Sequence, residues 1–338
     1  MIEFQYTRAS DVADAVRQLA GDPAAKFVAG GTNLIDLMKM DVERPTRVID
    51  ITGLQLKQVE GTPGGGLRIG ALVRNTDLAY HPLVEQRYPV LASALMAGAS
   101  QQLRNMASTG GNLMQRTRCS YFYDTALPCN KRELGSGCSA IDGQNRGHAI
   151  LGTSDACIAT HPSDMCVALA MLEAKVHVTG PSGDRVIAFA DFHRLPGDTP
   201  QRDTNLEAGE LITGVELPPR GFATNYTYLK IRDRLSYAFA LVSVAVGLEL
   251  DGDTIKEGRF ALGGVAHKPW RDPRAETLLR GQPATTPTFT RAADLVLQGA
   301  RGYGQNTFKI ELARRSIVRA LTQAARGTPQ SQSDKKIR

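Results

Sequence analysis

The stretch that decides the fold is Lys26-Phe27-Val28-Ala29-Gly30-Gly31-Thr32-Asn33-Leu34. A short strand, Lys26 to Ala29, ends here in two glycines, and a helix is predicted to begin at Leu34. Glycine tolerates a positive φ and lets a ligand approach the backbone. Thr32 and Asn33 are predicted to cap the helix, whose free amides then point back at the glycines. Such a bend favours a negative charge, so we expect a diphosphate site. An ordinary tight turn is the alternative that a lone Gly-Gly pair leaves open.

Two better-known phosphate-binding motifs do not match this segment. The Rossmann fingerprint needs three spaced glycines and an acidic residue about 20 residues further on, and a Walker loop needs Gly-Lys-Thr or Gly-Lys-Ser. A dinucleotide other than NAD is therefore predicted. A second glycine pair follows a helix, in Ser108-Thr109-Gly110-Gly111-Asn112. Two Gly-Gly turns beside hydroxyl residues suit one extended cofactor at a domain interface, where such ligands tend to bind.

The chain around the first glycine pair alternates between helix and strand patterns. Apolar residues at helical spacing predict a helix within Val12–Ala20, and Arg47–Asp50 is a second apolar strand. The alternation of strand, helix and strand indicates a small parallel sheet in residues 1–55.

The rest of the chain follows a different pattern. Residues 56–215 mix strands and helices in an α+β order, and they include an Ala-rich helix predicted from Ser163 or Asp164 to Leu172. Residues 216–325 contain three successive strands and then helical segments. The stretch 326–338 is polar and is expected to be a flexible tail.

The composition is that of a globular protein, with 42% hydrophobic and 22% charged residues in a chain of 338. The net charge of +6 is spread among acids without a basic stripe, so no nucleic-acid partner is expected. No apolar run approaches the roughly 20 residues that cross a bilayer. Met1–Tyr6 lacks the basic and apolar regions of an export signal, so we expect folding in the cytoplasm unless a partner carries the chain elsewhere.

All five cysteines lie between residues 119 and 166. In a reducing compartment such clustering indicates metal or redox chemistry before disulfides. Four thiolates could hold either zinc or an iron–sulfur cluster, and the spacing of Cys119, Cys129, Cys138 and Cys157 is not the compact ferredoxin pattern. Cys166 occupies an apolar helix position and is predicted to be a buried core thiol.

A combined signal is carried by five segments spread over most of the chain, namely Phe27–Leu34, Ala107–Asn112, His161–Asp164, Gly209–Thr213 and Ala261–Ala266. Together, and in this order, they resemble the flavin-binding segments of a known family, the FAD-binding subunits of molybdenum hydroxylases of the xanthine dehydrogenase and aldehyde oxidoreductase type. Within this family the chain most resembles the FAD subunits of bacterial periplasmic aldehyde oxidoreductases.

The resemblance implies an α+β fold of the FAD-binding PCMH type. It would consist of two α/β subdomains, residues 1–55 and 56–215, followed by a C-terminal domain at 216–325. That last domain would contain a three-stranded antiparallel sheet and helices.

The resemblance also implies a role for each matching position. Residues 27–34, with Lys26 before them, would wrap the diphosphate of FAD through main-chain amides. The far side of the pyrophosphate and the ribityl chain would be held by Ser108, Thr109, Gly111 and Asn112.

Three further residues would contact the cofactor elsewhere. Asp164 would hydrogen-bond the ribityl or ribose hydroxyls, and Ile212 would pack near the flavin or adenine. Lys230 would lie near the pyrimidine edge of the isoalloxazine, where a cation favours the reduced, anionic flavin. Without the resemblance, Lys230 would be interpreted as a plain surface lysine.

A long loop at residues 113–160 separates the second glycine pair from the helix at Asp164, whereas most members of the family have a short link there. Long loops inside compact domains usually have a function. Members with this insertion carry a [4Fe-4S] cluster in it, so the resemblance assigns Cys119, Cys129, Cys138 and Cys157 as its ligands.

Other side chains of the loop leave their roles open. Tyr121-Phe122-Tyr123 could stack on the flavin, shield the cluster from water or only pack the loop. His148 and His161 are expected to be hydrogen-bonded structural residues.

The function implied by the resemblance is electron relay, with no catalytic residue on this chain. A molybdenum-cofactor-binding large subunit would oxidise the substrate. A small subunit would then pass electrons from its [2Fe-2S] clusters through this FAD to an external acceptor. The heterotrimer would be exported to the periplasm with a signal-bearing partner. Two alternatives are a stand-alone flavin oxidase or reductase of the vanillyl-alcohol-oxidase-like fold and a zinc-containing interaction module.

Overall fold

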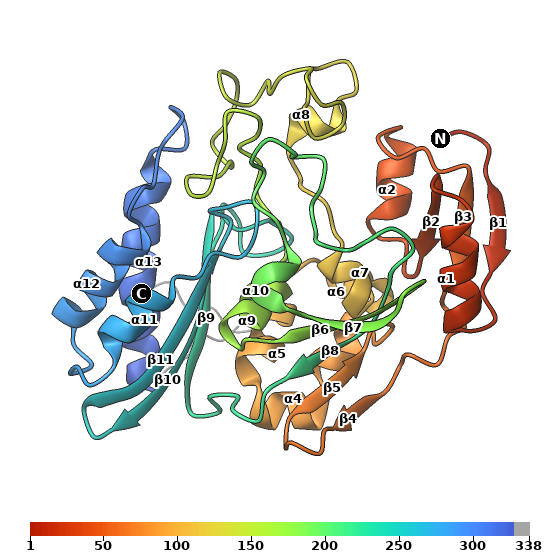
Figure 1. Cartoon of the computed structure of the whole chain (residues 1–338). Helices are drawn as coiled ribbons and strands as arrows, with labels where there is room; N and C mark the ends of the chain where they lie inside the picture. Colours follow the sequence, from red (N-terminus) through yellow and green to blue (C-terminus); the bar gives the residue numbers. More distant parts are fainter. Residues whose placement is uncertain (328–338) are drawn as a thin grey trace.

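The computed structural model describes residues 1–327, and its strands form three sheets (Figure 1). The tail predicted at 326–338 lies outside the described residues, apart from residues 326 and 327. The strands are β1 (Gln5–Arg8), β2 (Ala25–Val28), β3 (Arg47–Asp50), β4 (Val59–Gly61), β5 (Leu67–Gly70), β6 (Lys175–Gly180), β7 (Gly183–Ala188), β8 (Leu211–Leu217), β9 (Asn225–Ile231), β10 (Val242–Asp251) and β11 (Thr254–Gly263). The helices are α1 (Val12–Ala20), α2 (Leu34–Lys39), α3 (Asn75–Ala79), α4 (Pro82–Arg87), α5 (Pro89–Ala97), α6 (Gln101–Met106), α7 (Thr109–Leu113), α8 (Ser120–Tyr123), α9 (Asp164–Met171), α10 (Phe189–Phe192), α11 (Pro273–Leu279), α12 (Thr286–Val296) and α13 (Phe308–Ala325).

The N-terminal sheet has the order β1-β3-β2, and both of its pairings are parallel. The helix α1 begins at the side chain of Asp11, which accepts a hydrogen bond from the backbone N–H of Asp14 and so satisfies a free amide of the first turn. Ala15 and Val16 are its buried residues. The predicted small parallel sheet is confirmed, and the chain leaves β2 directly into the first glycine pair.

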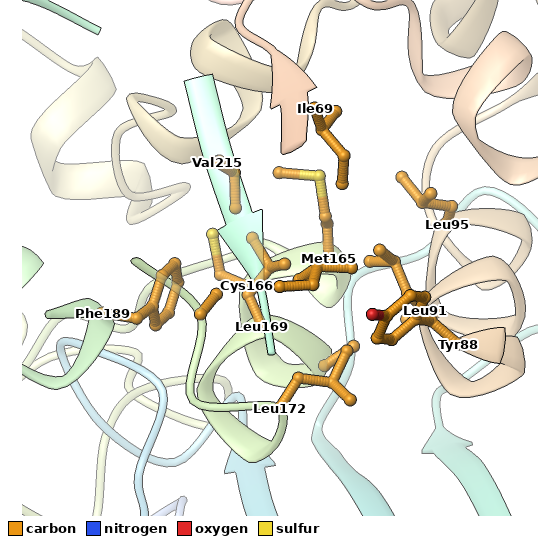
Figure 2. Packing of buried hydrophobic residues seen from close by; sticks show 14 of the residues in the cluster. Ile69, Tyr88, Leu91, Leu95, Met165, Cys166, Leu169, Leu172, Phe189 and Val215 are labelled. Carbon is orange, nitrogen blue, oxygen red and sulfur yellow. The ribbon is translucent and has the colours of Figure 1, made fainter. Parts of the chain in front are cut away.

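The middle sheet has the order β4-β5-β8-β6-β7, with every pairing antiparallel. The helix α9 packs beside it and has almost no exposed residues. Figure 2 shows Met165 and Leu169 of this helix among Leu91 of α5 and Val215 of β8. Ser163 Oγ accepts from the backbone N–H of Cys166 at 3.0 Å, so the predicted cap is confirmed. Asp164, the first residue of α9, is therefore held in place by a helix that is buried in the core.

The C-terminal sheet is antiparallel, with the order β11-β10-β9. The helix α13 packs on β9 and β10, whereas α9 and α5 also contact this sheet (Figure 1). This arrangement joins the C-terminal unit to the middle one through α9. The predicted three-stranded antiparallel sheet with helices is confirmed, and so is the fold class as a whole. The boundaries of the three predicted domains stay predictions.

The cysteine-bearing loop runs from α7 to α9 and contains one short helix, α8, within the described residues (Figure 1). It is attached to the C-terminal unit by buried polar groups. Lys309 Nζ donates to the carbonyl oxygens of His148 at 2.8 Å and Gly264 at 2.5 Å. The backbone N–H of Ile150 donates to the carbonyl of Val265 at 2.9 Å. The loop is thus built into the fold on a defined surface.

Candidate functional site

A groove of about 700 Å³ runs between the three units of the fold. Its volume is typical of a ligand site, for which about 300–1,000 Å³ is usual. It brings together residues that lie far apart in the sequence. Seven of the predicted cofactor-binding residues line it, namely Gly31, Thr32, Asn33, Gly111, Asn112, Asp164 and Lys230. We call it the main groove.

The two glycines of the first pair are required for different reasons. Gly31 has φ +71°, a left-handed conformation that other residues rarely adopt. At Gly30, an added Cβ would overlap the carbonyl oxygen of Met106, which is backbone and cannot move aside. The close approach at Gly30 is therefore to the end of α6, while Gly31 shapes the edge of the groove.

Asn33 does not cap α2, contrary to prediction. Its Oδ1 instead accepts from the backbone N–H of Arg116 at 2.9 Å, which ties the glycine loop to the start of the cysteine loop. Its Nδ2 is buried and has no hydrogen-bond partner. A buried donor without a partner is costly, so this amide suits a polar ligand in the groove.

The second glycine pair is not a turn, which corrects the prediction. Gly110 and Gly111 lie inside the short helix α7, because the side chain of Ser108 caps it by accepting from the N–H of Gly111 at 3.2 Å. Thr109 Oγ1 donates to the carbonyl of Val73 at 2.9 Å. Ser108 and Thr109 are buried and position α7, and neither lines the main groove.

Asn112 connects α7 to two neighbouring segments. Its Nδ2 donates to Oδ1 of Asn75 at 2.7 Å, and its Oδ1 accepts from Ser163 Oγ at 2.6 Å. The Nδ2 of Asn75, like that of Asn33, is buried without a partner and belongs to a residue that lines the groove. Two unpaired amide donors therefore border the same space.

The remaining predicted cofactor residues do not line the main groove. Lys26 is half exposed and lies 3.8 Å from Glu43. Phe27 packs on the N-terminal core, and Ile212 is buried in the middle core. The others that stay outside the lining are Val28, Ala29, Gly30 and Leu34.

Lys230 is buried, so its interpretation as a surface lysine is wrong. Its Nζ donates to Oδ2 of Asp164 at 2.8 Å and to the carbonyl of Ala97 at 3.0 Å. Tyr228 O–H donates to the other carboxylate oxygen of Asp164 at 2.6 Å. Burial, and then the charge of Asp164, raise the pKa of Tyr228 well above its ordinary value, so this hydroxyl stays a donor. The carboxylate of Asp164 is fully oriented at the wall of the groove.

The groove has an excess of positive charge that the sequence did not reveal. Cationic side chains besides Lys230 line it from four different segments: Lys39, Arg104, Arg118 and Arg234. Asp36 and Asp164 are the acidic residues of the lining. Cations at this density attract an anionic ligand such as a diphosphate. No local motif marks these residues, because only the tertiary fold brings them together.

A second cavity, of about 410 Å³, continues the main groove toward the cysteine loop. The two share Arg118, Pro162, Ser163, Asp164, Ala238 and Phe239 in their linings. The lining of this second space includes Cys119, His148, Gly263 and Gly264. We call it the side cavity. An elongated ligand could therefore extend from the first glycine loop past Asp164.

The four predicted metal ligands surround one small cavity, which we call the cysteine cavity. Cys119, Cys129, Cys138 and Cys157 all line it. Cys129 and Cys138 face each other in an antiparallel bridge, and the turn from Ser154 to Cys157 brings in the fourth cysteine. Sequence spacing alone could not predict this convergence.

Three of the four thiols have shifted pKa values. A hydrogen bond with Cys157 lowers the pKa of Cys138 to about 6, and the same contact raises the pKa of Cys157. Burial raises the pKa of Cys119 to about 11. A metal centre that binds Cys119 and Cys157 would have to displace protons from their sulfurs.

Two of the three aromatic residues of α8 line the cysteine cavity, and the third contacts a residue of the main groove. Tyr121 and Phe122 line the cysteine cavity, and Phe122 is fully buried. Tyr123 O–H donates to Oδ2 of Asp36 at 3.0 Å. None of the three residues lines either part of the groove. This placement favours shielding of the cysteine cavity over stacking on a flavin.

Cys166 is fully buried in α9, and burial raises its pKa to about 12, which keeps the thiol protonated. Its sulfur lies within 4.8 Å of ring nitrogens of His161 and His193. Desolvation lowers the pKa of both histidines below the ordinary value, so they are neutral. The group lies in the core beside α9.

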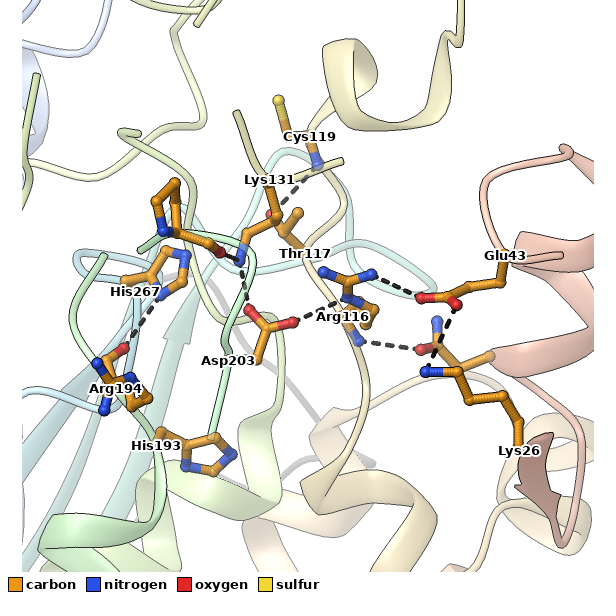
Figure 3. Close-up of polar contacts among 12 residues, drawn as sticks. Lys26, Glu43, Arg116, Thr117, Cys119, Lys131, His193, Arg194, Asp203 and His267 are labelled. Atoms are coloured by element: carbon orange, nitrogen blue, oxygen red, sulfur yellow. Dashed lines mark hydrogen bonds and ion pairs between the residues drawn. The ribbon is translucent and has the colours of Figure 1, made fainter. Parts of the chain in front are cut away.

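A charged network supports the cysteine loop from below (Figure 3). Arg116 donates to Glu43 at 2.6 Å and to Asp203 at 2.8 Å. Asp203 also accepts from the buried Nζ of Lys131, which in turn donates to the carbonyl of Pro200 at 2.9 Å. The network links the N-terminal unit, the loop and the segment before β8. It positions Lys131, which lines the cysteine cavity.

The groove is suited to an anionic, nucleotide-sized ligand, and the similarity to known proteins gives the class of the chain. The chain belongs to the family of FAD-binding subunits of molybdenum hydroxylases. The family described as FAD binding domain in molybdopterin dehydrogenase matches residues 2–220, and the CO dehydrogenase flavoprotein C-terminal domain matches residues 226–324. The chain is therefore an oxidoreductase subunit, and the resemblance seen in its sequence is confirmed.

Particular relatives place it more narrowly. It is 53% identical over 326 residues to the aldehyde oxidoreductase FAD-binding subunit PaoB of Escherichia coli, which covers 96% of this chain and 99% of that one. It is 29% identical to the glyceraldehyde dehydrogenase medium chain of Sulfolobus acidocaldarius, over 83% of this chain and 82% of the other. The chain is thus an FAD subunit of the aldehyde oxidoreductase type.

Solved structures show the same fold. Quinoline 2-oxidoreductase from Pseudomonas putida 86 aligns with a TM-score of 0.74 and 25% identity, over 96% of this chain and 98% of that one. Carbon monoxide dehydrogenase from Hydrogenophaga pseudoflava aligns with a TM-score of 0.76 and 25% identity, over 97% and 100%. Of the helices within the described residues, none combines the length and apolar composition that a membrane span requires.

The main groove fits FAD in charge and in hydrogen bonding. The buried amides of Asn33 and Asn75 lack partners and border it. Its cations outnumber its acids, as the diphosphate of a dinucleotide requires. The groove and side cavity together also offer a continuous, elongated space.

Proposed function

We propose that this chain is the FAD-carrying electron-transfer subunit of a molybdenum-dependent aldehyde oxidoreductase complex. Bound FAD would supply redox chemistry in one- or two-electron steps, which can link single-electron carriers to a final acceptor. The observation that carries the proposal is the continuous groove, lined by both predicted glycine segments and by the Asp164–Lys230 pair. The groove also has a cationic rim, which consists of Lys39, Arg104, Arg118 and Arg234.

The residues of this chain would bind and orient the cofactor. Asn33 and Asn75 would offer their unpaired amides to polar atoms of the ligand, and the cationic rim would attract the diphosphate. Asp164 would accept hydrogen bonds from hydroxyl groups of the ligand, with its orientation fixed by Lys230 and Tyr228. These roles extend the predictions made from the sequence.

We also propose that Cys119, Cys129, Cys138 and Cys157 hold a [4Fe-4S] cluster. All four cysteines line one cavity, so they could bind a single metal centre. Four thiolates suit either zinc or an iron–sulfur cluster. The proposal of a cluster follows the resemblance seen in the sequence.

The partners would be a molybdenum-cofactor-binding large subunit and a small subunit with [2Fe-2S] clusters, with an external electron acceptor at the end of the chain. This proposal rests on the high identity to an aldehyde oxidoreductase FAD subunit over almost the whole of both chains. The location of the complex in the periplasm is part of the same proposal. Fractionation of cells that express the complete complex would test the location, and a purely cytoplasmic complex would contradict it.

The test uses the chain purified with its copurifying subunits. We expect one FAD per chain, a broad iron–sulfur absorption band, and more iron than [2Fe-2S] clusters on a small subunit account for. Zinc in place of that additional iron would favour the zinc-containing alternative for the cysteine cavity. A preparation of this chain alone that contains flavin and oxidises substrate would favour the stand-alone flavoenzyme instead.

A further inference from the structure

One histidine lies against a predicted cluster ligand in the wall between two cavities. Nε2 of His148 is 3.1 Å from Sγ of Cys119. Cys119 lines both the cysteine cavity and the side cavity, whereas the other three cysteines line the cysteine cavity alone. His148 lines the side cavity. The pair therefore separates the space for a cluster from the continuation of the flavin groove.

The position of His148 is fixed through its backbone. Its carbonyl oxygen accepts from Nζ of Lys309 at 2.8 Å, and its N–H donates to the carbonyl of Asn145 at 2.9 Å. Asn306 Nδ2 donates to the next carbonyl, that of Ala149, at 2.9 Å. Lys309 and Asn306 are both fully buried. The imidazole is thus placed against Cys119 by contacts that do not involve the ring.

The chemistry of this contact depends on the state of the sulfur. A cysteine that binds iron is a thiolate and accepts hydrogen bonds, and a neutral imidazole has one N–H to donate. A hydrogen bond to a ligand sulfur stabilises the more negative, reduced state of a cluster more than the oxidised one. Hydrogen bonds to the sulfurs are among the known determinants of cluster potential.

We propose that His148 is a positioning residue that donates its Nε2–H to the sulfur of Cys119 and so raises the reduction potential of the cluster. The inference rests on the proposed function, because it requires a cluster in the cysteine cavity. It adds that Cys119 is the ligand directed toward the flavin. The reduction potential of the cluster is then modified at Cys119, the ligand that faces the side cavity.

The experiment compares His148→Leu, which removes the donor, with His148→Gln, whose amide can place an N–H near the position of Nε2. His81→Leu is the matched control, because His81 lies outside the linings of all three cavities. Each variant is purified as the complete complex. Iron and FAD are counted, and the cluster is titrated at controlled potential while its electron paramagnetic resonance signal is followed.

The expected result is a lower midpoint potential for His148→Leu at unchanged iron and FAD content. A tenfold change in the reduction equilibrium corresponds to about 59 mV for one electron. The glutamine variant should recover much of the shift, and the control should show none. Loss of the cluster in the leucine variant alone would also support the proposal, because the two variants differ in the donor.

An unchanged potential in an iron-replete His148→Leu complex would overturn the inference while leaving the proposed cluster in place. Loss of the cluster in both variants would overturn it too, since the ring and not its N–H would then be required. A wild-type complex without the additional iron would refute the proposed cluster and this inference together.

Discussion

Lys230 and Asp164 form an ion pair of 2.8 Å in which both side chains are almost completely buried. The pair links β9 of the C-terminal sheet to the first residue of α9. It also forms part of the groove wall, so the same contact serves both stability and the orientation of a ligand. Lys230 has no other carboxylate partner among the described residues.

Replacement of Lys230 by methionine should leave the carboxylate of Asp164 buried without its cation. Breaking a buried pair by removing one partner costs about 3–5 kcal/mol, so the free energy of unfolding should fall by that amount. FAD occupancy should fall as well. The double variant Lys230→Met with Asp164→Asn should recover part of the stability in denaturant titrations. A single variant as stable as the wild type would show that the pair contributes nothing to the fold.

Replacement of Gly30 by alanine should destabilise the first glycine loop, because the new Cβ meets the carbonyl of Met106. Overpacking of this kind costs about 1–3 kcal/mol. Thermal unfolding and FAD content should both decrease. Gly53→Ala is the control, since an added Cβ at Gly53 has no neighbour within 4 Å. Equal effects of the two substitutions would contradict the role given to Gly30.

Replacement of Cys129 or Cys157 by serine should remove the additional iron from the complex, beyond that of the [2Fe-2S] clusters, while FAD remains bound, because the cysteine cavity and the main groove share no cysteine. Cys166→Ser is the control and should retain its iron. Its sulfur belongs to α9 and does not line the cysteine cavity. Metal analysis and the visible spectrum measure both quantities. Full iron content in the Cys129 and Cys157 variants would rule out the proposed ligand set.

The free energy of unfolding should depend on pH because of Asp203. Burial alone would raise the pKa of this carboxyl, but the ammonium of Lys131 and the guanidinium of Arg116 hold it well below its usual range. A carboxyl group whose pKa is lower in the folded than in the unfolded chain stabilises the fold at pH values above its unfolded pKa of about 3.9. This stabilisation is lost as the pH falls toward the pKa of the folded state.

The variant Asp203→Asn should therefore be less stable at pH 7, by about 1–3 kcal/mol, because it leaves Lys131 without a carboxylate partner and Arg116 with Glu43 alone. It should also lose less stability than the wild type between pH 5 and pH 3. Unfolding free energies measured across this range check both points. Asp251→Asn is the control, since Asp251 has a 74% exposed side chain. A wild-type pH profile in the Asp203 variant would refute this account.

Local patterns predicted much of this fold. Periodicity placed α1, β3 and the capped start of α9 correctly, because each depends on nearby residues. It failed at Gly110-Gly111, where the capping side chain of Ser108 favours a helix over the predicted turn. The predicted cap at Asn33 was also wrong, because the side-chain oxygen of Asn33 accepts a hydrogen bond from the distant backbone N–H of Arg116.

The site was predictable in part, for a related reason. The glycine segments and the cysteines carry recognisable sequence signals. Asn75, Arg104 and Arg118 carry none, because they join the groove only through the packing of separate segments. The burial of Lys230 likewise depends on α9 and on the carbonyl of Ala97, which its own strand cannot reveal.

Because the cysteine loop is attached to α13, it can reach its final structure only after α13 has been synthesised. The carbonyls around His148 are held by Lys309 and Asn306, which leave the ribosome long after the last of the four cysteines. The wall beside Cys119 therefore cannot assume its final form on a nascent chain that stops short of α13. The site of the proposed cluster would therefore be completed only after α13 has been synthesised.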